Sequence, residues 1–368
     1  MEKLIIRILV FILIVSCTNE SRKTSIGKKS LETEHVKREQ IFKNAKISYH
    51  WDFKRKYAKK LTKKLSKDLS IKSFYYRIYN DTLVMIDWNN KNLVLFDKDL
   101  NKIKNIGKSG EGPNENGTLM YFGKEKSNYY VYDFTKQIIK KIDDSGKVIA
   151  YFKIPHSYRG KHLQKDIFFL SYLTIDDSLH LAKYTFNNNS LLDLVTLNKN
   201  LFENLKDLDS KYINSLVFDG NFDMGTNKNI SIYFLKKGGY FIVINDTSKY
   251  HVYRTIDKTP LPKGITRDLG GGISVPVTVP DNQFFLSATT DDKYIYLLNT
   301  ITAKPNQAFR VIDIYAISDG SYKGSIKVKD LSDGQKANLI SLDIHSNLLY
   351  VYYDDLTMVK YAMEEISE

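Results

Sequence analysis

The glycine-rich stretch IGKSGEGPNENG, residues 106–117, is the part of this 368-residue chain whose composition comes nearest to a phosphate-binding loop. A P-loop has two glycines that flank four residues, followed by Lys and then Ser or Thr at the start of a helix. Here Lys108 and Ser109 precede the loop, Pro113 removes a backbone donor, and no helical pattern follows. We therefore predict that the segment turns the chain, because its glycines allow backbone angles that other residues rarely adopt.

Acidic and amide side chains recur just after strand-like segments at five places: Asp87, Asp133, Asn245, Asn299 and Asp354. If the repeats surround an axis, these residues form a ring on one face, where their oxygens could bind a cation or a hydroxyl-rich ligand. Such side chains also often hydrogen-bond the backbone two residues further on and so begin a turn. We favour the turn-forming role, and the five residues stand as the candidate ligand-binding set.

Histidine and nucleophile motifs predict no catalytic centre. The sequence has no His-x-x-x-His pair, no HExxH motif and no GxSxG motif. The seven histidines are scattered: His35, His50, His156, His162, His180, His251 and His345. His156 and His162 come nearest to a metal-binding pair, and we expect them to be ordinary surface residues. We predict no metal, no cofactor and no enzymatic activity.

The N-terminal segment predicts an exported, lipid-anchored protein. MEKLIIRILVFILIVSC, residues 1–17, has a basic start and an apolar run too short to span a bilayer, as in a secretory signal peptide. The end of the run resembles a bacterial lipobox, and its Cys17 is the only cysteine, so we predict that Cys17 carries the lipid, with palmitate as one of the acyl chains. A lone cysteine can otherwise serve as a small buried apolar residue.

Most of the positive charge lies near the N-terminus. The formal net charge is +13; residues 18–72 contain 17 Lys and Arg against 6 Asp and Glu, whereas residues 73–368 contain 36 against 35. Basic patches are typical of nucleic-acid or membrane binding. For an exported chain we expect no nucleic acid but an anionic membrane surface, or simply a solvated basic face. The polar residues 18–44 predict a flexible tether.

Strand patterns repeat along the rest of the chain. LVMID (83–87) and YYVYD (129–133) each begin a strand, loop, strand, turn, strand series, and the same 46-residue interval separates Asp97 from Asp143. Weaker copies follow at 179–201, 240–257, 294–328 and 348–363. Six copies of about 49 residues predict an all-β, six-bladed β-propeller with four-stranded antiparallel blades.

The last copy is too short to contain its outermost strand. Alternating residues 47–53 predict a strand that completes this blade and removes its free edge. The basic segment 54–71 has Tyr or Leu at every fourth position, which fits a short helix on a membrane or a cap over one end of the domain. We favour the cap, so the propeller domain is predicted to span 45–368, with the closing strand and basic cap at 45–72.

Residues 83–115 resemble a family of six-bladed β-propeller lipoproteins of Bacteroidota, a TolB-like group. The motif is Gly-x-Gly-Pro-x-Glu, matched by Gly110, Gly112, Pro113 and Glu115 at the junction between two blades. Asn116 and Gly117 replace the aromatic residue that the family motif leads us to expect next. The resemblance implies a location in the cell envelope and docking to other envelope proteins. Surface export in this group tends to use an acidic run after the lipidated cysteine, and residues 18–22 contain one acidic residue, which favours the periplasmic side of the outer membrane.

These observations predict a lipid-anchored binding or scaffold module that docks an envelope protein through its propeller loops. A first alternative is a glycan-binding accessory protein for nutrient uptake, which exposed aromatic residues at 284–285 and 309 would favour. These positions lie in the loop runs 270–285 and 299–310. A second alternative is a hydrolase or lyase, which would need Asp87, Asp133 and Asp354 to point into the central channel.

Overall fold

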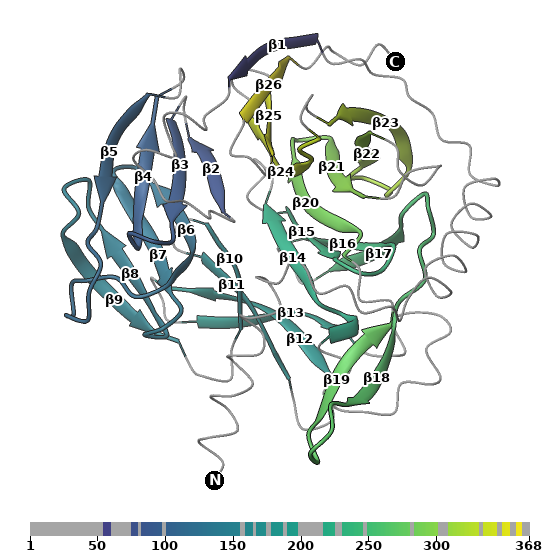
Figure 1. Ribbon diagram of the computed structural model, residues 1–368, viewed down its shortest axis with the longest axis horizontal. Coiled ribbons are helices and arrows are strands. Elements are labelled where there is room, and N and C mark those ends of the chain that lie inside the picture. Colours follow the sequence, from purple (N-terminus) through teal and green to yellow (C-terminus); the bar gives the residue numbers. More distant parts are fainter. Residues whose placement is uncertain are drawn as a thin grey trace. The chain divides into compact units, whose positions relative to one another are not determined.

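The computed structural model describes a ring of antiparallel β-sheets (Figure 1). It describes residues 54–59, 75–79, 82–97, 101–154, 159–164, 167–173, 178–186, 190–197, 216–224, 230–245, 249–279, 283–300, 308–330, 334–343, 348–353 and 358–362. All of these lie in the compact unit Ala45–Glu368. The unit contains six four-stranded sheets arranged as a six-bladed β-propeller, as the repeats predict. Over these same ranges, no helix is both long and apolar enough to cross a bilayer. The predicted signal peptide and tether, with Cys17, lie outside the described residues.

Blades 1 to 3 follow one another along the chain. Blade 1 contains β2 (Tyr76–Tyr79), β3 (Thr82–Asp87), β4 (Asn92–Phe96) and β5 (Lys102–Ile106). Blade 2 contains β6 (Leu119–Glu125), β7 (Asn128–Asp133), β8 (Ile138–Ile142) and β9 (Val148–Lys153). Blade 3 contains β10 (Arg159–Gln164), β11 (Ile167–Leu173), β12 (Leu179–Thr185) and β13 (Ser190–Leu197).

Blades 4 to 6 include one insertion. Blade 4 contains β14 (Gly220–Met224), β15 (Ile230–Leu235), β16 (Tyr240–Asn245) and β17 (Tyr250–Arg254). A separate hairpin, β18 (Lys263–Asp268) and β19 (Ser274–Val279), precedes blade 5, which contains β20 (Phe285–Thr290), β21 (Tyr294–Asn299), β22 (Phe309–Ala316) and β23 (Tyr322–Lys329). Blade 6 contains β24 (Ala337–Asp343), β25 (Leu348–Tyr353) and β26 (Met358–Ala362), and its fourth strand is β1 (Lys54–Lys59).

The strand that completes blade 6 is not the one that the alternation predicts. β1 pairs antiparallel with β26, from Lys54 opposite Ala362 to Lys59 opposite Met358, with an irregularity between Arg55 and Tyr57. The segment 54–59, interpreted above as part of a helical or irregular cap, is therefore a strand, and the predicted strand 47–53 lies outside the described residues. The four-residue spacing of apolar residues was misleading here, because an edge strand needs a partner for its backbone more than it needs a buried face.

The first strand of each blade lies innermost. β24 contacts both β2 and β20, β14 contacts both β20 and β10, and β10 contacts β6, while β6 also contacts β3 of blade 1. These contacts close the ring between blade 1 and blade 6. Side chains on first strands are therefore the ones that can meet near the centre.

Middle strands are apolar on both faces because a blade lies on either side of them. Met85 of β3 belongs to one apolar cluster with Tyr352 of blade 6, whereas its neighbour Val84 belongs to another with Val131 of blade 2. Every residue of β4 is buried. The continuous apolar runs of the sequence thus reflect two-sided burial between blades, in contrast to the alternation of a sheet with one wet face.

Strand tyrosines follow the same rule. Tyr129 packs in the cluster between blades 1 and 2, while Tyr130 and Tyr132 pack in the cluster between blades 2 and 3. Each of the three is 1% exposed. This alternation is the packing role expected for most of the tyrosines in strands.

Pairing with β1 predicts where truncation damages the fold. A chain that begins at residue 54 keeps β1, whereas one that begins at residue 61 leaves β26 as an open edge. We expect the second chain to melt at least about 2 °C lower than the first and to aggregate more on heating. Thermal unfolding and light scattering of chains that begin at residues 45, 54 and 61 measure this. A loss that occurs between 45 and 54 would show that residues 47–53 close the ring instead.

Candidate functional site

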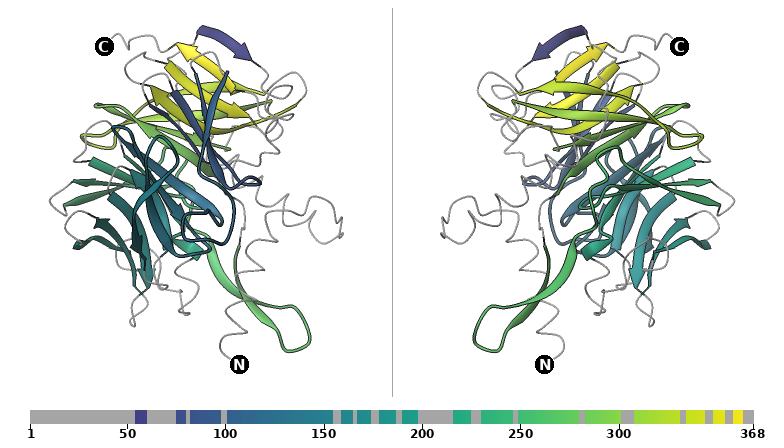
Figure 2. Two further views of the ribbon diagram at one scale, coloured as in Figure 1. Left: turned by 90° about the vertical axis from the view of Figure 1, so that its left-hand side faces the viewer. Right: turned by 90° about the vertical axis from the view of Figure 1, so that its right-hand side faces the viewer.

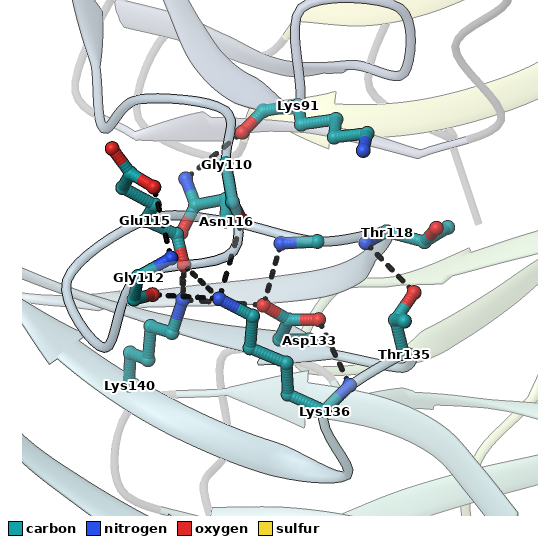
Figure 3. Close-up of polar contacts among 11 residues, drawn as sticks. Lys91, Gly110, Gly112, Glu115, Asn116, Thr118, Asp133, Thr135, Lys136 and Lys140 are labelled. Carbon is teal, nitrogen blue, oxygen red and sulfur yellow. Dashed lines mark hydrogen bonds and ion pairs between the residues drawn. The ribbon is translucent and has the colours of Figure 1, made fainter.

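The glycine-rich loop is the crossing between blades 1 and 2, because it joins β5 to β6 (Figure 3). Its ends are tied by backbone hydrogen bonds from Gly110 N to Asn116 O (3.1 Å) and from Asn116 N to Lys108 O (2.6 Å). Glu115 Oε2 accepts a hydrogen bond from Gly112 N at 2.9 Å. Gly110 has φ +155°, and a β-carbon at this position would collide with the Glu115 carboxylate. The Gly-x-Gly-Pro-x-Glu motif thus has a steric reason for this glycine.

Two lysines of blade 2 donate hydrogen bonds to oxygen atoms of this loop. Lys136 Nζ donates to the carbonyls of Gly112 (2.7 Å) and Glu115 (2.8 Å). Lys140 Nζ donates to the Glu115 carbonyl and to Asn116 Oδ1 (3.2 Å). The loop therefore presents backbone oxygens to cations of its own chain, whereas a phosphate site presents N–H groups. We call Lys136, Lys140, Gly112, Glu115 and Asn116, together with Asp133, the blade latch.

Asp133 supplies the anion of the blade latch. It is fully buried, and its Oδ2 lies 3.1 Å from Lys140 Nζ and accepts a hydrogen bond from Gly117 N at 2.8 Å. Burial lowers the pKa of Lys140, although Asp133 opposes this effect. Asn116 extends the latch to blade 1, because its Nδ2 donates to Lys91 O at 2.9 Å. Asn116 and Gly117, where the family motif predicts an aromatic residue, instead make polar contacts that join the two blades.

The buried Lys140–Asp133 pair predicts a large stability effect. Lys140→Met leaves Asp133 without its ammonium partner, and we expect the free energy of unfolding to fall by about 3 kcal/mol. Lys141→Met, on the next residue and the other face of β8, is the matched control and should cost under about 1 kcal/mol. Denaturant unfolding measures both variants. Equal losses in the two would show that Lys140 contributes no more than the partly buried Lys141, whose ammonium lies over the Tyr130 ring.

The five residues of the candidate ligand-binding set do not share one role in the structure. Asp87 is fully buried at the end of β3, where Oδ1 accepts hydrogen bonds from Asn89 N and Asn90 N, both at 3.1 Å. It therefore begins its own turn, which is the role that we favoured. Asp133 belongs to the blade latch, and Asp354 lies outside the described residues.

Asn245 is not equivalent to the others. Asp87, Asp133 and Asn299 end the second strands of their blades, whereas Asn245 ends β16, the third strand of blade 4. The equivalent second strand, β15, ends at Leu235. The prediction of a matched position at Asn245 was wrong because β15 and β16 are equally apolar, so the repeat could be aligned one strand out of phase.

Asn299 is hydrogen-bonded to a buried carboxyl group, that of Asp313. Its Nδ2 donates to Asp313 of β22, which also accepts from Ser325 Oγ at 2.5 Å, and Ser325 in turn bonds to Tyr322. Burial raises the pKa of Asp313 to about 7; the bond from Ser325 lowers it, a charge at Asp257 raises it, and the bond from Asn299 lowers it. Asp313 is 4% exposed, so this chain of hydrogen bonds lies inside blade 5.

The raised pKa of Asp313 predicts that stability depends on pH. Below about pH 4 this carboxyl is protonated in both the folded and unfolded chains and costs nothing; the cost grows as pH rises and is complete above about pH 7. Asp313→Asn keeps the shape without the charge. We expect this variant to gain roughly 2 kcal/mol more over the natural chain at pH 8 than at pH 5. Denaturant unfolding at both pH values tests this, and a gain independent of pH would contradict it.

Several of the other predicted residues are buried or partly buried. Phe284 and Phe285, proposed above as glycan-stacking residues, are 3% and 0% exposed, and Phe309 is partly buried beneath Lys327. His162 is buried, so the expectation of a surface residue was wrong for it, and His156 lies outside the described residues. In the part of the chain that the structure describes, no three His, Cys, Asp or Glu side chains gather as metal ligands would.

A polar cluster near the centre of the ring was missed from the sequence. Arg77 of β2 donates through Nη1 to Asp223 Oδ1 of β14 at 2.8 Å. Arg77 Nη2 lies 3.0 Å from His162 Nδ1 of β10, and the Tyr75 hydroxyl lies 3.1 Å from the same nitrogen. Because a guanidinium can only donate, His162 Nδ1 accepts this bond. We call Tyr75, Arg77, His162 and Asp223 the central cluster.

The central cluster joins blades that are not neighbours in the ring. Blade 1 lies between blades 6 and 2, yet Arg77 reaches residues of blades 3 and 4. These contacts must therefore cross the centre. Tyr75 adds blade 2, because its ring meets that of Tyr121 edge-on at 5.3 Å.

The charges of the central cluster balance. Burial lowers the pKa of Arg77, but Tyr75 and Asp223 raise it by more, so the guanidinium stays charged. The Arg77 side chain is 20% exposed, whereas that of Asp223 is 2% exposed. Arg77 is thus fixed by a buried carboxylate, while part of its side chain remains exposed.

A second charged group lies near strands of the central cluster, because Lys161 precedes His162 in β10 and Asp219 directly precedes β14. Asp219, just before β14, is within 2.6 Å of Lys161 Nζ and 3.0 Å of Lys236 Nζ. Burial raises the pKa of Asp219, but the two lysines lower it by more and hold it well below its usual range. The two lysines are 12% and 22% exposed and carry one net positive charge with Asp219 at neutral pH.

The comparisons with known proteins identify a fold. No family model matches the sequence, and a search of curated proteins gives no match. Among solved structures, the chain is similar to a member of the DUF4221 family from Bacteroides vulgatus, with 10% identity, 87% of this chain and 97% of that chain covered, and a TM-score of 0.50. It is less similar to a putative exported protein from Bacteroides fragilis, with 11% identity, 80% and 91% coverage, and a TM-score of 0.48. At such identities the likeness supports the β-propeller fold alone.

Proposed function

We infer that this protein is a binding module of the bacterial cell envelope and that it docks a protein partner at the central cluster. The observation that carries this proposal is the fixed, partly exposed Arg77, held by Asp223 and His162 where four blades converge. Arg and Tyr are the residues that most often dominate protein interfaces. A side chain that is already immobilised loses less entropy when a partner binds.

The proposed cellular location rests on the N-terminal sequence. A signal peptide that ends at Cys17 would leave the chain lipid-anchored, and the resemblance to Bacteroidota propeller lipoproteins favours the outer membrane on its periplasmic side. A rigid ring on a tether suits a scaffold that holds a partner near the membrane. The glycan-binding alternative loses support because Phe284 and Phe285 are buried, so they present no ring face to a sugar.

A double substitution with little change in side-chain size tests the central cluster. Tyr75→Phe with Arg77→Lys keeps a cation beside Asp223 but removes the hydroxyl and the planar fork of donors. We expect crosslinked recovery of the partner from native membranes to fall at least about ten-fold, since two anchoring contacts are weakened. Mass spectrometry of the captured proteins measures this, with the full-length lipidated chain as reference.

Two controls separate docking from folding and from anchoring. Lys102→Gln with Lys249→Gln removes two exposed charges outside the central cluster and should leave recovery unchanged. Cys17→Ala should abolish recovery if the lipid brings the chain to its partner. Full recovery by the Tyr75/Arg77 variant, with an unchanged melting temperature, would place docking elsewhere on the propeller.

A further inference from the structure

The hairpin β18–β19 and its turn form an arm, residues 263–279, that belongs to none of the blades. It is a two-stranded sheet of its own, inserted between blades 4 and 5. Figure 2 shows it extending beyond the blade strands. Packing within the propeller does not account for this length of chain, which is the reason to ask what the arm contacts.

The foot of the arm is firmly held by the turn between β15 and β16. Lys237 Nζ donates to Thr278 Oγ1 at 2.6 Å. The chain on either side of the arm is also held: Gly239 N donates to Thr259 O at 2.9 Å four residues before the arm, and Phe284 N donates to Lys236 O at 2.8 Å five residues after it. The arm is therefore a fixed projection, aimed by blade 4.

One face of the arm is mainly apolar. The register places Ile265 opposite Val277 and Arg267 opposite Val275, so alternate residues of both strands share a face. The residues on this face are Lys263, Ile265, Arg267, Val275, Val277 and Val279. Ile265 and Val279 are 39% and 45% exposed, although aliphatic side chains usually lie in the core.

The tip of the arm continues this apolar character. Leu269 and Ile273 are each 57% exposed and are joined by a hydrogen bond from Leu269 N to Ile273 O at 2.9 Å. Between them lie Gly270, Gly271 and Gly272, all at positive φ and with no atoms near a would-be β-carbon. Two aliphatic side chains thus stand side by side at the end of a narrow turn.

Cations flank the apolar face. Lys263 and Arg267 are exposed on it, and Arg254 and Lys258 are exposed in the segment that leads into the arm. The nearby carboxylates lie elsewhere, because Asp257 is buried and Asp268, opposite Ser274, belongs to the other face of the hairpin. A second copy of the arm would bring these cations together, which disfavours self-association through this face.

We propose that the arm inserts its tip into the surface of an anionic phospholipid bilayer. Leu269 and Ile273 enter the boundary of the acyl chains, while Lys263 and Arg267 lie among the lipid phosphates and extend along the apolar face. This contact is separate from any lipid on Cys17 and fixes the orientation of the ring, since the arm is held rigidly at its foot.

A local fluorescent label tests the insertion. In the full chain with Cys17→Ala, a cysteine at Leu269 carries an environment-sensitive NBD dye, and vesicles contain equal parts of phosphatidylcholine and phosphatidylglycerol. We expect the emission to rise and shift to the blue on these vesicles. The same dye at Tyr151, which is 60% exposed on outer strand β9, should not change. Because the dye reports its own surroundings, membrane binding by the N-terminal segment does not imitate this result.

Paired substitutions separate the apolar and the charged contributions. Lys263→Gln with Arg267→Gln should lower the vesicle partition coefficient, as reported by the dye at position 269, roughly 25-fold, or about five-fold for each charge. In the chain with Cys17→Ala and no dye, Leu269→Glu with Ile273→Glu should lower partition at least about ten-fold, whereas Ile149→Glu with Tyr151→Glu on β9 should not. A Leu269 dye that ignores the vesicles, or that shifts without them as the protein self-associates, would overturn the proposal.

Discussion

Packing between blades is the constraint on which the rest of this structure depends. Middle strands such as β3 and β4 bury both faces, one against each neighbouring blade, so no blade can satisfy its apolar surface alone. The ring must therefore be closed, and β1 completes the last blade with a strand from the opposite end of the domain. Closure in turn fixes the first strands around a centre, where side chains of blades 1, 3 and 4 come within hydrogen-bonding distance.

Buried charge is managed in two ways in this molecule. In the blade latch, Lys140 pairs with Asp133 and donates to a carbonyl of the loop. The role of the latch is structural, since it joins blade 1 to blade 2. The central cluster also pairs its charges, but the Arg77 side chain is 20% exposed. That difference in exposure is why one group is assigned to structure and the other to binding. Asp313 instead accepts hydrogen bonds from Asn299 and Ser325, and burial raises its pKa to about 7.

The sequence predicts the architecture well because the signals of the middle strands are strong. Six copies, the blade crossing at Gly110 and the turn begun by Asp87 all follow from apolar runs and from turn chemistry. The central cluster was missed because several first strands mix polar and apolar residues without a clear period, as in RGKHLQ of β10 and GNFDM of β14. A charged residue at the same place in several first strands would have been the available signal. Asn245 and the closing strand were misplaced because apolar spacing alone does not set strand phase or pairing.

We propose that a protein partner binds over the centre of the ring. The most direct test is to map, by mass spectrometry, which lysines of this chain crosslink to the captured partner in native membranes. Binding over the centre predicts crosslinks at Lys161 and Lys236, the two lysines that pair with Asp219. Crosslinks confined to lysines of outer strands, such as Lys102 of β5 and Lys153 of β9, would contradict it.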